Sequence, residues 1–225
     1  MATYGGGLVA GDEIDLTLEV GPEATAAVTT QAQTKVYRSD GRWASQRMTA
    51  RIGEDAALAI VPEPTACFAG ARYRQYQRFE LHPRASLLLV DSITPGRAAR
   101  GERWAFDACL SRNDVQHGGK TVLRDAVRLV AGEGPPVERR MGKFDFLATI
   151  VAVGPAAAAV AGSLLDLAGR RAVAGDDALV AASPLLDGAY VRVAARSVGA
   201  GLALVRERVA LAAARFGRDA LERRP

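Results

Sequence analysis

The feature that most constrains this chain is a long succession of short strand-like segments, separated by turn residues, that runs from residue 12 to about residue 130. Between residues 14 and 20 every second residue is apolar, which is typical of a strand with one buried face. The run Leu87–Val90 is apolar throughout, which favours a central strand covered on both faces. We therefore predict a mainly β fold: a layered, multi-stranded β body whose strands are stacked as in a sandwich or as in a β-helix.

Turn residues set the predicted connections between these strands. Gly21–Pro22 ends the first strand, and Gly118–Gly119 turns the chain back on itself. Asp40–Gly41 is a dipeptide typical of hairpins, so we predict that the segments on either side of it pair with each other. The predicted strands cover residues 14–20, 35–37, 43–52, 87–90, 104–110 and 122–130, and a loop is predicted at 132–136.

The last third of the chain has a different pattern, with the element order β-α-β-β-α. Apolar residues at 202, 205, 209, 212 and 216 form one stripe of a helix, and covering the protein's own sheet is favoured over docking a partner. The predicted elements are a strand at 146–152, a helix at 155–168, a hairpin across 179–196 and a helix at 202–216. We predict a single domain over residues 1–225, with a β-rich body at 1–136 and a mixed α+β C-terminal part at 137–225.

Composition and charge exclude several classes of protein. The formal net charge is only +4 and the positive residues are spread along the sequence, so no nucleic-acid partner is expected. The uncharged stretch between Asp145 and Asp166 has the length of a membrane span, but Gly154–Pro155 breaks it, so we predict no membrane segment. Cys67 and Cys109 lie too far apart for a zinc or redox motif. Because the N-terminus also lacks the pattern of a signal peptide, we expect a cytoplasmic protein with buried, reduced thiols.

No motif in the sequence supports a catalytic or cofactor site. The segment Asp114–Thr121 ends in Gly-Lys-Thr like a phosphate-binding loop, but it lacks the first glycine and a following helix, so a glycine turn is favoured. The two histidines, His82 and His117, both adjoin predicted turns. We therefore expect that the protein is not an enzyme. The alternative is a small hydrolase that uses an Asp/Glu pair such as Asp91 and Glu102.

Four short segments are more specific than the composition requires: Gly6–Asp12, Thr29–Ser39, Pro62–Thr65 and Gly96–Glu102. Taken singly, each is explained by a turn, a polar strand or a loop. Their sequences, order and spacing together resemble the UreD family of urease accessory proteins, called UreH in some organisms, whose members show a G-G-x-x-x-G-D start, a T-T-Q-x-x-T-K-x-Y-R-S strand and a G-R-x-x-x-G-E loop. Family members usually carry several dozen further residues before the first motif, so we expect an N-terminal family segment to be missing here.

The resemblance implies a β-rich, cytoplasmic and non-enzymatic maturation factor. Its implied partners are UreF, the GTPase UreG and the subunits of apo-urease. Nickel would be in transit to the urease active site, with no cofactor bound stably. A carrier of this kind needs oxygen ligands that bind weakly enough to release the ion. The candidate positions within the motifs are Asp12, Thr34, Glu63 and Glu102, and the alternative for each is a solvated turn residue or a strand-end cap.

Overall fold

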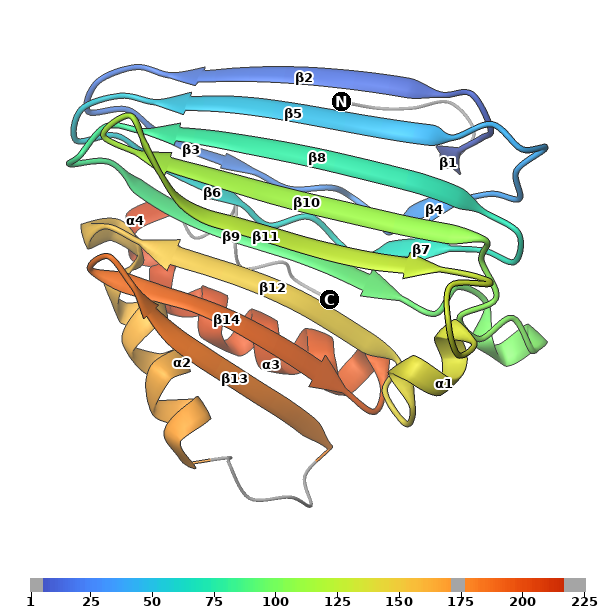
Figure 1. Cartoon of the computed structure of the whole chain (residues 1–225). Helices are drawn as coiled ribbons and strands as arrows, with labels where there is room; N and C mark the ends of the chain where they lie inside the picture. Colours follow the sequence, from blue (N-terminus) through green and yellow to red (C-terminus); the bar gives the residue numbers. More distant parts are fainter. Residues whose placement is uncertain (1–5, 171–176, 217–225) are drawn as a thin grey trace.

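The computed structural model describes residues 6–170 and 177–216, whose strands form two facing sheets that the chain visits in turn (Figure 1). The first is a five-stranded sheet in which four strands are parallel. Only β11 is antiparallel, because the tight turn at Gly118–Gly119 returns the chain beside β10. Its strands, from one edge to the other, are β2 (Glu13–Val20), β5 (Ala44–Ile52), β8 (Arg72–Leu81), β10 (Ala108–His117) and β11 (Lys120–Val130).

Part of the nine-stranded sheet lies behind the first sheet in Figure 1, and its C-terminal strands continue below the first sheet. Its strands are β1 (Gly7–Leu8), β3 (Thr25–Val28), β4 (Thr34–Val36), β6 (Ala57–Ile60), β7 (Thr65–Cys67), β9 (Ser86–Thr94), β12 (Phe146–Val153), β13 (Ala178–Leu185) and β14 (Gly188–Ala195). After each of β2, β5 and β8 the chain crosses into this sheet, so β3, β6 and β9 stack in parallel, as do β4, β7 and β9. The mainly β prediction is confirmed, and the stacking is that of a β-helix.

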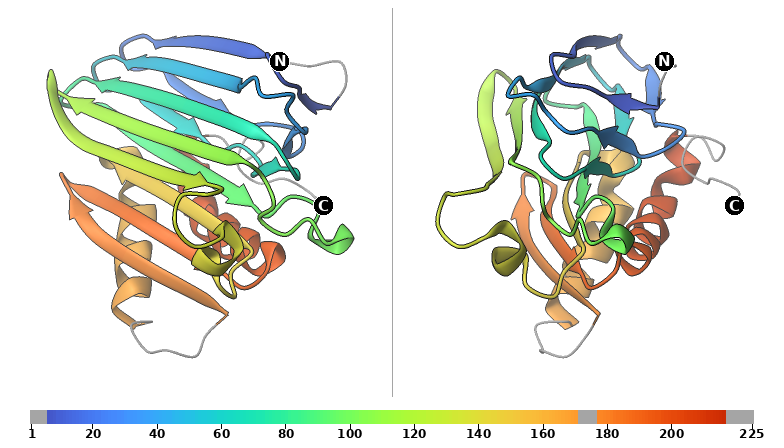
Figure 2. Two further views of the ribbon diagram at one scale, coloured as in Figure 1. Left: turned by 45° about the vertical axis from the view of Figure 1, so that its right-hand side comes forward. Right: turned by 90° about the vertical axis from the view of Figure 1, so that its right-hand side faces the viewer.

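The helical segments that follow β12 cover the outer face of the nine-stranded sheet (Figure 2). The helical segments are η1 (Ala98–Arg100), α1 (Val137–Met141), η2 (Pro155–Ala157), α2 (Ala158–Arg170), α3 (Val198–Val209), η3 (Ala210–Ala212) and α4 (Ala213–Phe216). The predicted apolar stripe packs on the protein's own sheet, since Val205, Val209 and Phe216 are buried there. The helix begins earlier than predicted, because the Ser197 side chain caps it. None of the described helices is long and apolar enough to cross a membrane.

Three apolar clusters form the core. The first, which includes Ile150 and Leu164, lies between the nine-stranded sheet and the helices. The other two lie between the sheets, one around Phe79 and Leu89 and one around Trp104. The predicted central strand is confirmed, because β9 contributes side chains to clusters on both of its faces.

Two local predictions are wrong. Asp40–Gly41 does not make a hairpin, because β4 and β5 lie in different sheets and each pairs with its own parallel neighbours. The dipeptide instead turns the corner from one sheet to the other, and an ion pair between Asp40 and Arg42 fixes that corner. Residues 104–107 are not a strand either, because Trp104 adopts a φ of +54° and its indole N–H donates to the Phe144 carbonyl at 3.0 Å. The apolar alternation there belongs to a loop that seals one end of the core.

The predicted β-α-β-β-α order of the C-terminal part is observed in β12, α2, β13, β14 and α3. A short helix, α1, precedes it and was not predicted. Strand β12 pairs with β9 from Leu147 to Val153, so the segments 1–136 and 137–225 share one sheet. The two parts therefore have a common core at this boundary.

Candidate functional site

A belt of polar side chains crosses the space between the two sheets. It separates the apolar cluster around Phe79 from the one around Trp104. Most of its members are wholly or largely buried, and they come from seven strands. We call these residues the polar belt: Gln46, Gln75, Gln77, Asp91, Ser111, Asn113, Asp125, Thr149, Tyr190 and Arg192.

Strand register brings the belt together. Successive side chains of a strand point to opposite faces, so residues two apart share a face. On β8 the inward pair Gln75 and Gln77 stands opposite Ser111 and Asn113 of β10. Asn113 in turn stands opposite Asp125 of β11. The strand register therefore places polar residues of neighbouring strands side by side, and together they form a polar layer.

Asp91 is the carboxylate of the belt on the nine-stranded sheet. Its Oδ1 accepts a hydrogen bond from Gln75 Nε2 at 3.1 Å. Its Oδ2 accepts from Ser111 Oγ at 2.5 Å and from Asn113 Nδ2 at 3.0 Å. All three donors lie on the five-stranded sheet, so Asp91 connects the two sheets.

Asp125 is the second carboxylate, and only 4% of its side chain is exposed. It accepts from Tyr190 Oη at 2.8 Å and from Thr149 Oγ1 at 3.1 Å, and it forms an ion pair with Arg192. Asn113 Nδ2 also lies 3.4 Å from Asp125, so this amide bridges the two carboxylates. Two carboxylates and one guanidinium leave the belt with one net negative charge.

Burial sets the protonation of the phenols in and beside the belt. It raises the pKa of Tyr190 and, together with the nearby Asp91 carboxylate, raises the pKa of Tyr73 well above its usual value. Burial acts to lower the pKa of Arg192, but its contacts with Tyr190 and Asp125 raise it overall. Both tyrosines therefore stay neutral donors near pH 7, and neither supplies a base.

The chemistry of the belt suits a hard divalent cation in passage more than one held in place. Its carboxylate, hydroxyl and amide oxygens are the ligands that such cations prefer. Every carboxylate oxygen already accepts from a protein donor, so an ion would have to displace these donors. Among the described residues no group of three or more His, Cys, Asp or Glu side chains could hold a metal ion.

Two of the four predicted site residues lie at a break in the nine-stranded sheet. Strand β6 ends at Ile60 opposite Leu89, and β7 begins at Thr65 opposite Ile93. The intervening residues 61–64 therefore run beside residues 90–92, at the level of Asp91. Glu63 lies in this break, and Thr34 is the first residue of β4, the strand paired with β7.

A cavity of about 320 Å³ opens on the outer side of this break. Glu63, Ser92 and Arg206 are among its lining residues, and Glu63 Oε1 lies 2.9 Å from Arg206 Nη2. The break thus places polar groups of the outer cavity next to the strand that carries Asp91.

Asp12 and Glu102 lie at other places, so the four predicted residues do not form one cluster. Asp12 caps its glycine turn by accepting a hydrogen bond from the Val9 N–H at 2.9 Å. Glu102 pairs with Arg97 and accepts from the Ala69 N–H at 3.2 Å. The Arg97 guanidinium lowers the pKa of Glu102, which keeps this carboxylate ionised.

The hydrolase alternative gains no support from these positions. Asp91 is bonded within the belt, Glu102 is bonded to Arg97, and the two have no bonding partner in common among the described residues. A general acid needs a raised pKa, whereas that of Glu102 is lowered.

The remaining motifs have structural roles. Gly118–Gly119 joins two strands and opens no helix, so the glycine-turn interpretation of the Gly-Lys-Thr motif is confirmed. Both histidines lie at turns, as predicted, and His117 Nε2 is 3.1 Å from the Pro83 carbonyl. Cys67 and Cys109 are buried free thiols, as predicted, but the fold brings them together, and their mutual hydrogen bond raises the pKa of Cys67.

Comparison with known proteins gives a consistent result. The model of the UreD urease accessory protein family matches residues 1–225. A urease accessory protein UreD of Anaeromyxobacter sp. (strain Fw109-5) is 53% identical over 225 residues, which is all of this chain and 76% of that protein. One of Sorangium cellulosum (strain So ce56) is 47% identical over 228 residues, all of this chain and 71% of that protein. A urease accessory protein D of Oryza sativa subsp. indica is 40% identical over 154 residues, 68% of this chain and 50% of that protein.

Proposed function

Because the chain belongs to the UreD family of urease accessory proteins, we propose that it acts in urease maturation as a non-catalytic, cytoplasmic subunit that joins UreF and the GTPase UreG on apo-urease. The match of the family model to the whole chain is the observation that carries this proposal. The two-sheet body supports it, because many of its described charged groups are bonded to one another, as in the pairs Arg97–Glu102, Arg112–Asp114 and Arg192–Asp125.

The cargo in this proposal is nickel, and its route is the polar belt. A divalent cation cannot cross apolar packing at an acceptable cost, so it needs a continuous polar path. The belt is such a layer, between two apolar clusters. Its single net negative charge would attract a cation. The side chains that already donate hydrogen bonds to Asp91 and Asp125 would compete with the ion for these carboxylates and so favour its release.

The break in the nine-stranded sheet is the proposed way in or out. Glu63 and Ser92 line the outer cavity, and Asp91 lies on the same stretch of β9 as Ser92. Thr34 flanks the break through the pairing of β4 with β7. Asp12 and Glu102 remain candidates from the family resemblance alone.

The test is to mature the cognate urease in a host without its own urease, together with UreF, UreG and this chain. Urease nickel content, urease activity and the amount of each subunit that co-purifies with the chain are measured. We expect Asp91→Asn and Glu63→Gln to lower nickel content and activity several-fold while assembly stays intact, because both changes remove charge and keep side-chain size. Asp55→Asn, which alters an exposed carboxylate paired with Arg84, is the matched control.

The double variant Asp12→Ala, Glu102→Ala forms a separate arm of the same experiment. Normal nickel content in Asp91→Asn would refute the belt as the route, and normal nickel content in the double variant would remove those two residues from it. A wild-type chain that co-purifies with none of the urease, UreF and UreG subunits would refute the maturation role itself.

A further inference from the structure

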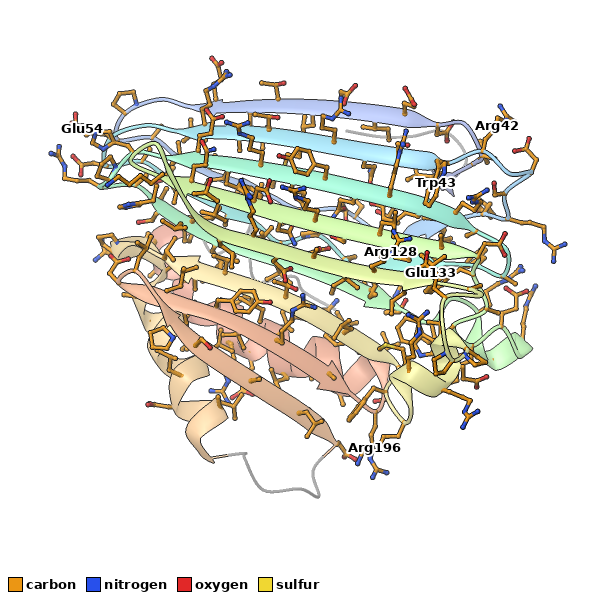
Figure 3. The ribbon with its side chains drawn as sticks, in the orientation of Figure 1. Arg42, Trp43, Glu54, Arg128, Glu133 and Arg196 are labelled. Carbon is orange, nitrogen blue, oxygen red and sulfur yellow. The ribbon has the colours of Figure 1, made fainter. Side chains whose placement is uncertain are left out.

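No helix or strand of the described residues covers the outer face of the five-stranded sheet. A parallel sheet is usually covered on both faces. Here α2 and α3 lie beyond the nine-stranded sheet, and no described helix crosses the outer side of β5, β8 or β10 (Figures 1 and 2). The outward side chains of these strands therefore meet solvent (Figure 3).

Arginine dominates this surface. We call the outward side chains of β5, β8, β10 and β11 the arginine face. It carries two carboxylates, Glu80 and Asp114, against eight arginines: Arg47, Arg51, Arg72, Arg74, Arg78, Arg112, Arg124 and Arg128. A chain whose formal net charge is only +4 therefore concentrates positive charge on one sheet.

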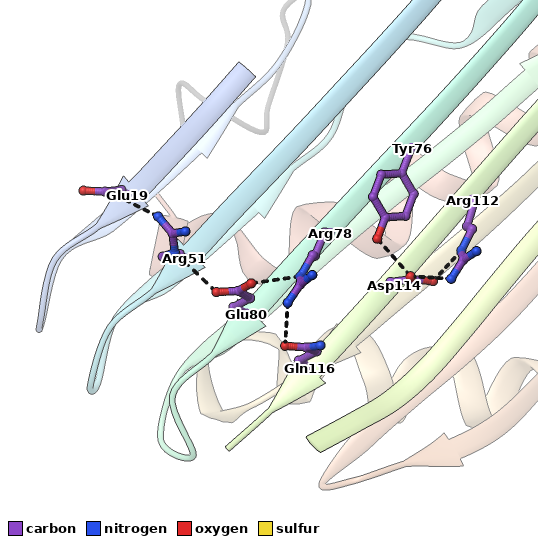
Figure 4. A network of polar contacts seen from close by, with 8 residues as sticks. All are labelled: Glu19, Arg51, Tyr76, Arg78, Glu80, Arg112, Asp114 and Gln116. Carbon is purple, nitrogen blue, oxygen red and sulfur yellow. Dashed lines mark hydrogen bonds and ion pairs between the residues drawn. The ribbon is translucent and has the colours of Figure 1, made fainter. Parts of the chain in front are cut away.

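The edge strand β2 has the opposite charge. Its outward residues Glu13, Asp15 and Glu19 approach arginines at 3.8, 3.7 and 3.1 Å. The last of these contacts begins a chain of ion pairs that continues through Arg51 and Glu80 (Figure 4). The face thus has an acidic margin beside a basic centre, a mosaic that complements a protein surface better than a uniform polyanion.

Two arginines of the arginine face form no ion pair or hydrogen bond with a carboxylate among the described residues, although Arg124 stands opposite Asp114 in the strand register. Arg124 is exposed and makes no described hydrogen bond. Arg72 donates to the Gly41 carbonyl at 2.9 Å, and its guanidinium lies 4.8 Å from the centroid of the Trp43 ring. An arginine held on an aromatic ring is pre-organised for a bidentate carboxylate contact.

The same residue types recur near the middle of the face. The Arg112 guanidinium lies 5.5 Å from the Tyr76 ring, and both side chains bond Asp114. Arginine, tyrosine and tryptophan are the residues most enriched at the energetic centres of protein interfaces, whereas lysine is depleted there. Strands β5, β8 and β10 contain no lysine, and β11 contains one, Lys120, beside its turn.

We propose that the arginine face is a docking surface for an acidic patch of a protein partner. The inference rests on the proposed function, since it assigns a surface to one of the contacts that a maturation subunit must make. Nucleic acid is the other anion with a suitable charge, and the carboxylates of β2 disfavour it.

Charge reversal tests the proposal. Arg74→Glu with Arg124→Glu changes two outward residues without breaking a close ion pair, since Arg74 lies 3.8 Å from Glu13. Arg196→Glu with Arg215→Glu makes the same change in charge at exposed positions off the face. We expect the face variant to bind the cognate urease–UreF assembly about tenfold or more weakly at low salt, and the control variant to bind like wild type.

A second probe works without the cognate proteins. A fluorescein-labelled poly-glutamate peptide and a labelled DNA duplex are titrated with each variant, with anisotropy as the readout. We expect wild type and control to bind the peptide in a salt-dependent way and the face variant to lose that binding. Equal binding of the assembly by both variants, or tighter binding of DNA than of peptide by wild type, would overturn the proposal. If wild type binds the peptide but no cognate protein, the docking surface stands and the proposed function fails.

Discussion

At the scale of single residues, Asp125 holds together a buried group of polar side chains. It is buried and bonded to Tyr190, Thr149 and Arg192 at once. Replacing it with alanine would leave the largely buried Arg192 guanidinium without its carboxylate. Breaking a buried pair by removing one partner costs about 3–5 kcal/mol, so we expect Asp125→Ala to lower the free energy of unfolding by about 3 kcal/mol or more in urea denaturation.

A double-mutant cycle supplies the control for this prediction. With Arg192→Ala added, the unpaired charge disappears, so the double variant should be less destabilised than the sum of the two single changes. Additive losses, or a loss below about 1 kcal/mol for Asp125→Ala alone, would mean that Asp125 is not coupled to Arg192.

Asp114 provides a prediction about pH. Its carboxylate accepts two hydrogen bonds from Arg112, at 2.9 and 2.7 Å, and one from Tyr76 at 3.0 Å. The contact with Arg112 lowers the pKa of Asp114 although burial opposes this. The stabilisation is therefore fully present above the unfolded-state pKa, near 3.9, and is lost as the pH falls through the lower folded-state pKa.

We accordingly expect Asp114→Asn to cost about 1–3 kcal/mol at pH 7 and progressively less below about pH 4. Urea denaturation between pH 7 and pH 3 measures this difference. Asp15→Asn, an exposed carboxylate 3.7 Å from Arg47, should stay within about 0.5 kcal/mol of wild type at pH 7. A difference for Asp114→Asn that does not shrink in acid would contradict the assignment.

At the scale of elements, two glycines at the start of α3 offer a matched pair. A Cβ on Gly201 would lie 2.3 Å from the Phe146 ring, which is fully buried, whereas a Cβ on Gly199 would meet nothing within 4 Å. Gly201 thus lets the helix approach β12 closely. We expect Gly201→Ala to destabilise the protein by about 1–3 kcal/mol through overpacking.

Gly199→Ala should instead be neutral or stabilising by about 0.5–1 kcal/mol, because alanine is the better helix former. Thermal unfolding of the two variants side by side makes the comparison. Equal effects of the two substitutions would show that α3 does not pack on β12 as described.

The elements also show what the sequence can and cannot predict. Local patterns identified β2, β9, β12, α2 and the β13–β14 hairpin, because alternation, apolar runs and turn residues are read within one segment. The predicted hairpin at Asp40–Gly41 is wrong because a strand of a β-helix pairs with the equivalent strand of the next coil, about 30 residues along the chain. The same turn chemistry serves both a hairpin and a corner.

The polar belt was missed for a related reason. Gln75 with Gln77 and Ser111 with Asn113 look like ordinary polar positions along a strand, and only the register aligns them across sheets. One pattern in the sequence could have indicated the belt. Gln75 and Gln77 occupy two successive inward positions of a strand whose other inward positions, Tyr73 and Phe79, are aromatic. Their contact with Asp91 depends on how the two sheets pack, which the pattern within one strand does not reveal.

At the scale of the whole molecule, the helical layer and the β body share one core. Leu164 of α2 is fully buried in the cluster that also contains Leu88 and Val90 of β9. Trp104 lies in a different cluster, between the sheets. If residues 1–225 form a single domain, as we predict from the sequence, the two clusters should unfold in one cooperative transition, and a cavity beneath α2 should destabilise both together.

We expect Leu164→Ala to lower the free energy of unfolding by about 2–5 kcal/mol. It should shift two signals together: tryptophan fluorescence, which reports the N-terminal β body because Trp43 and Trp104 both lie there, and circular dichroism at 222 nm, which reports mainly the C-terminal helices. Leu211→Ala, which alters a side chain that is 48% exposed, should leave both transitions near those of wild type. A helical signal that melts before the fluorescence changes would divide the chain into two units, and the single-domain prediction would then be wrong.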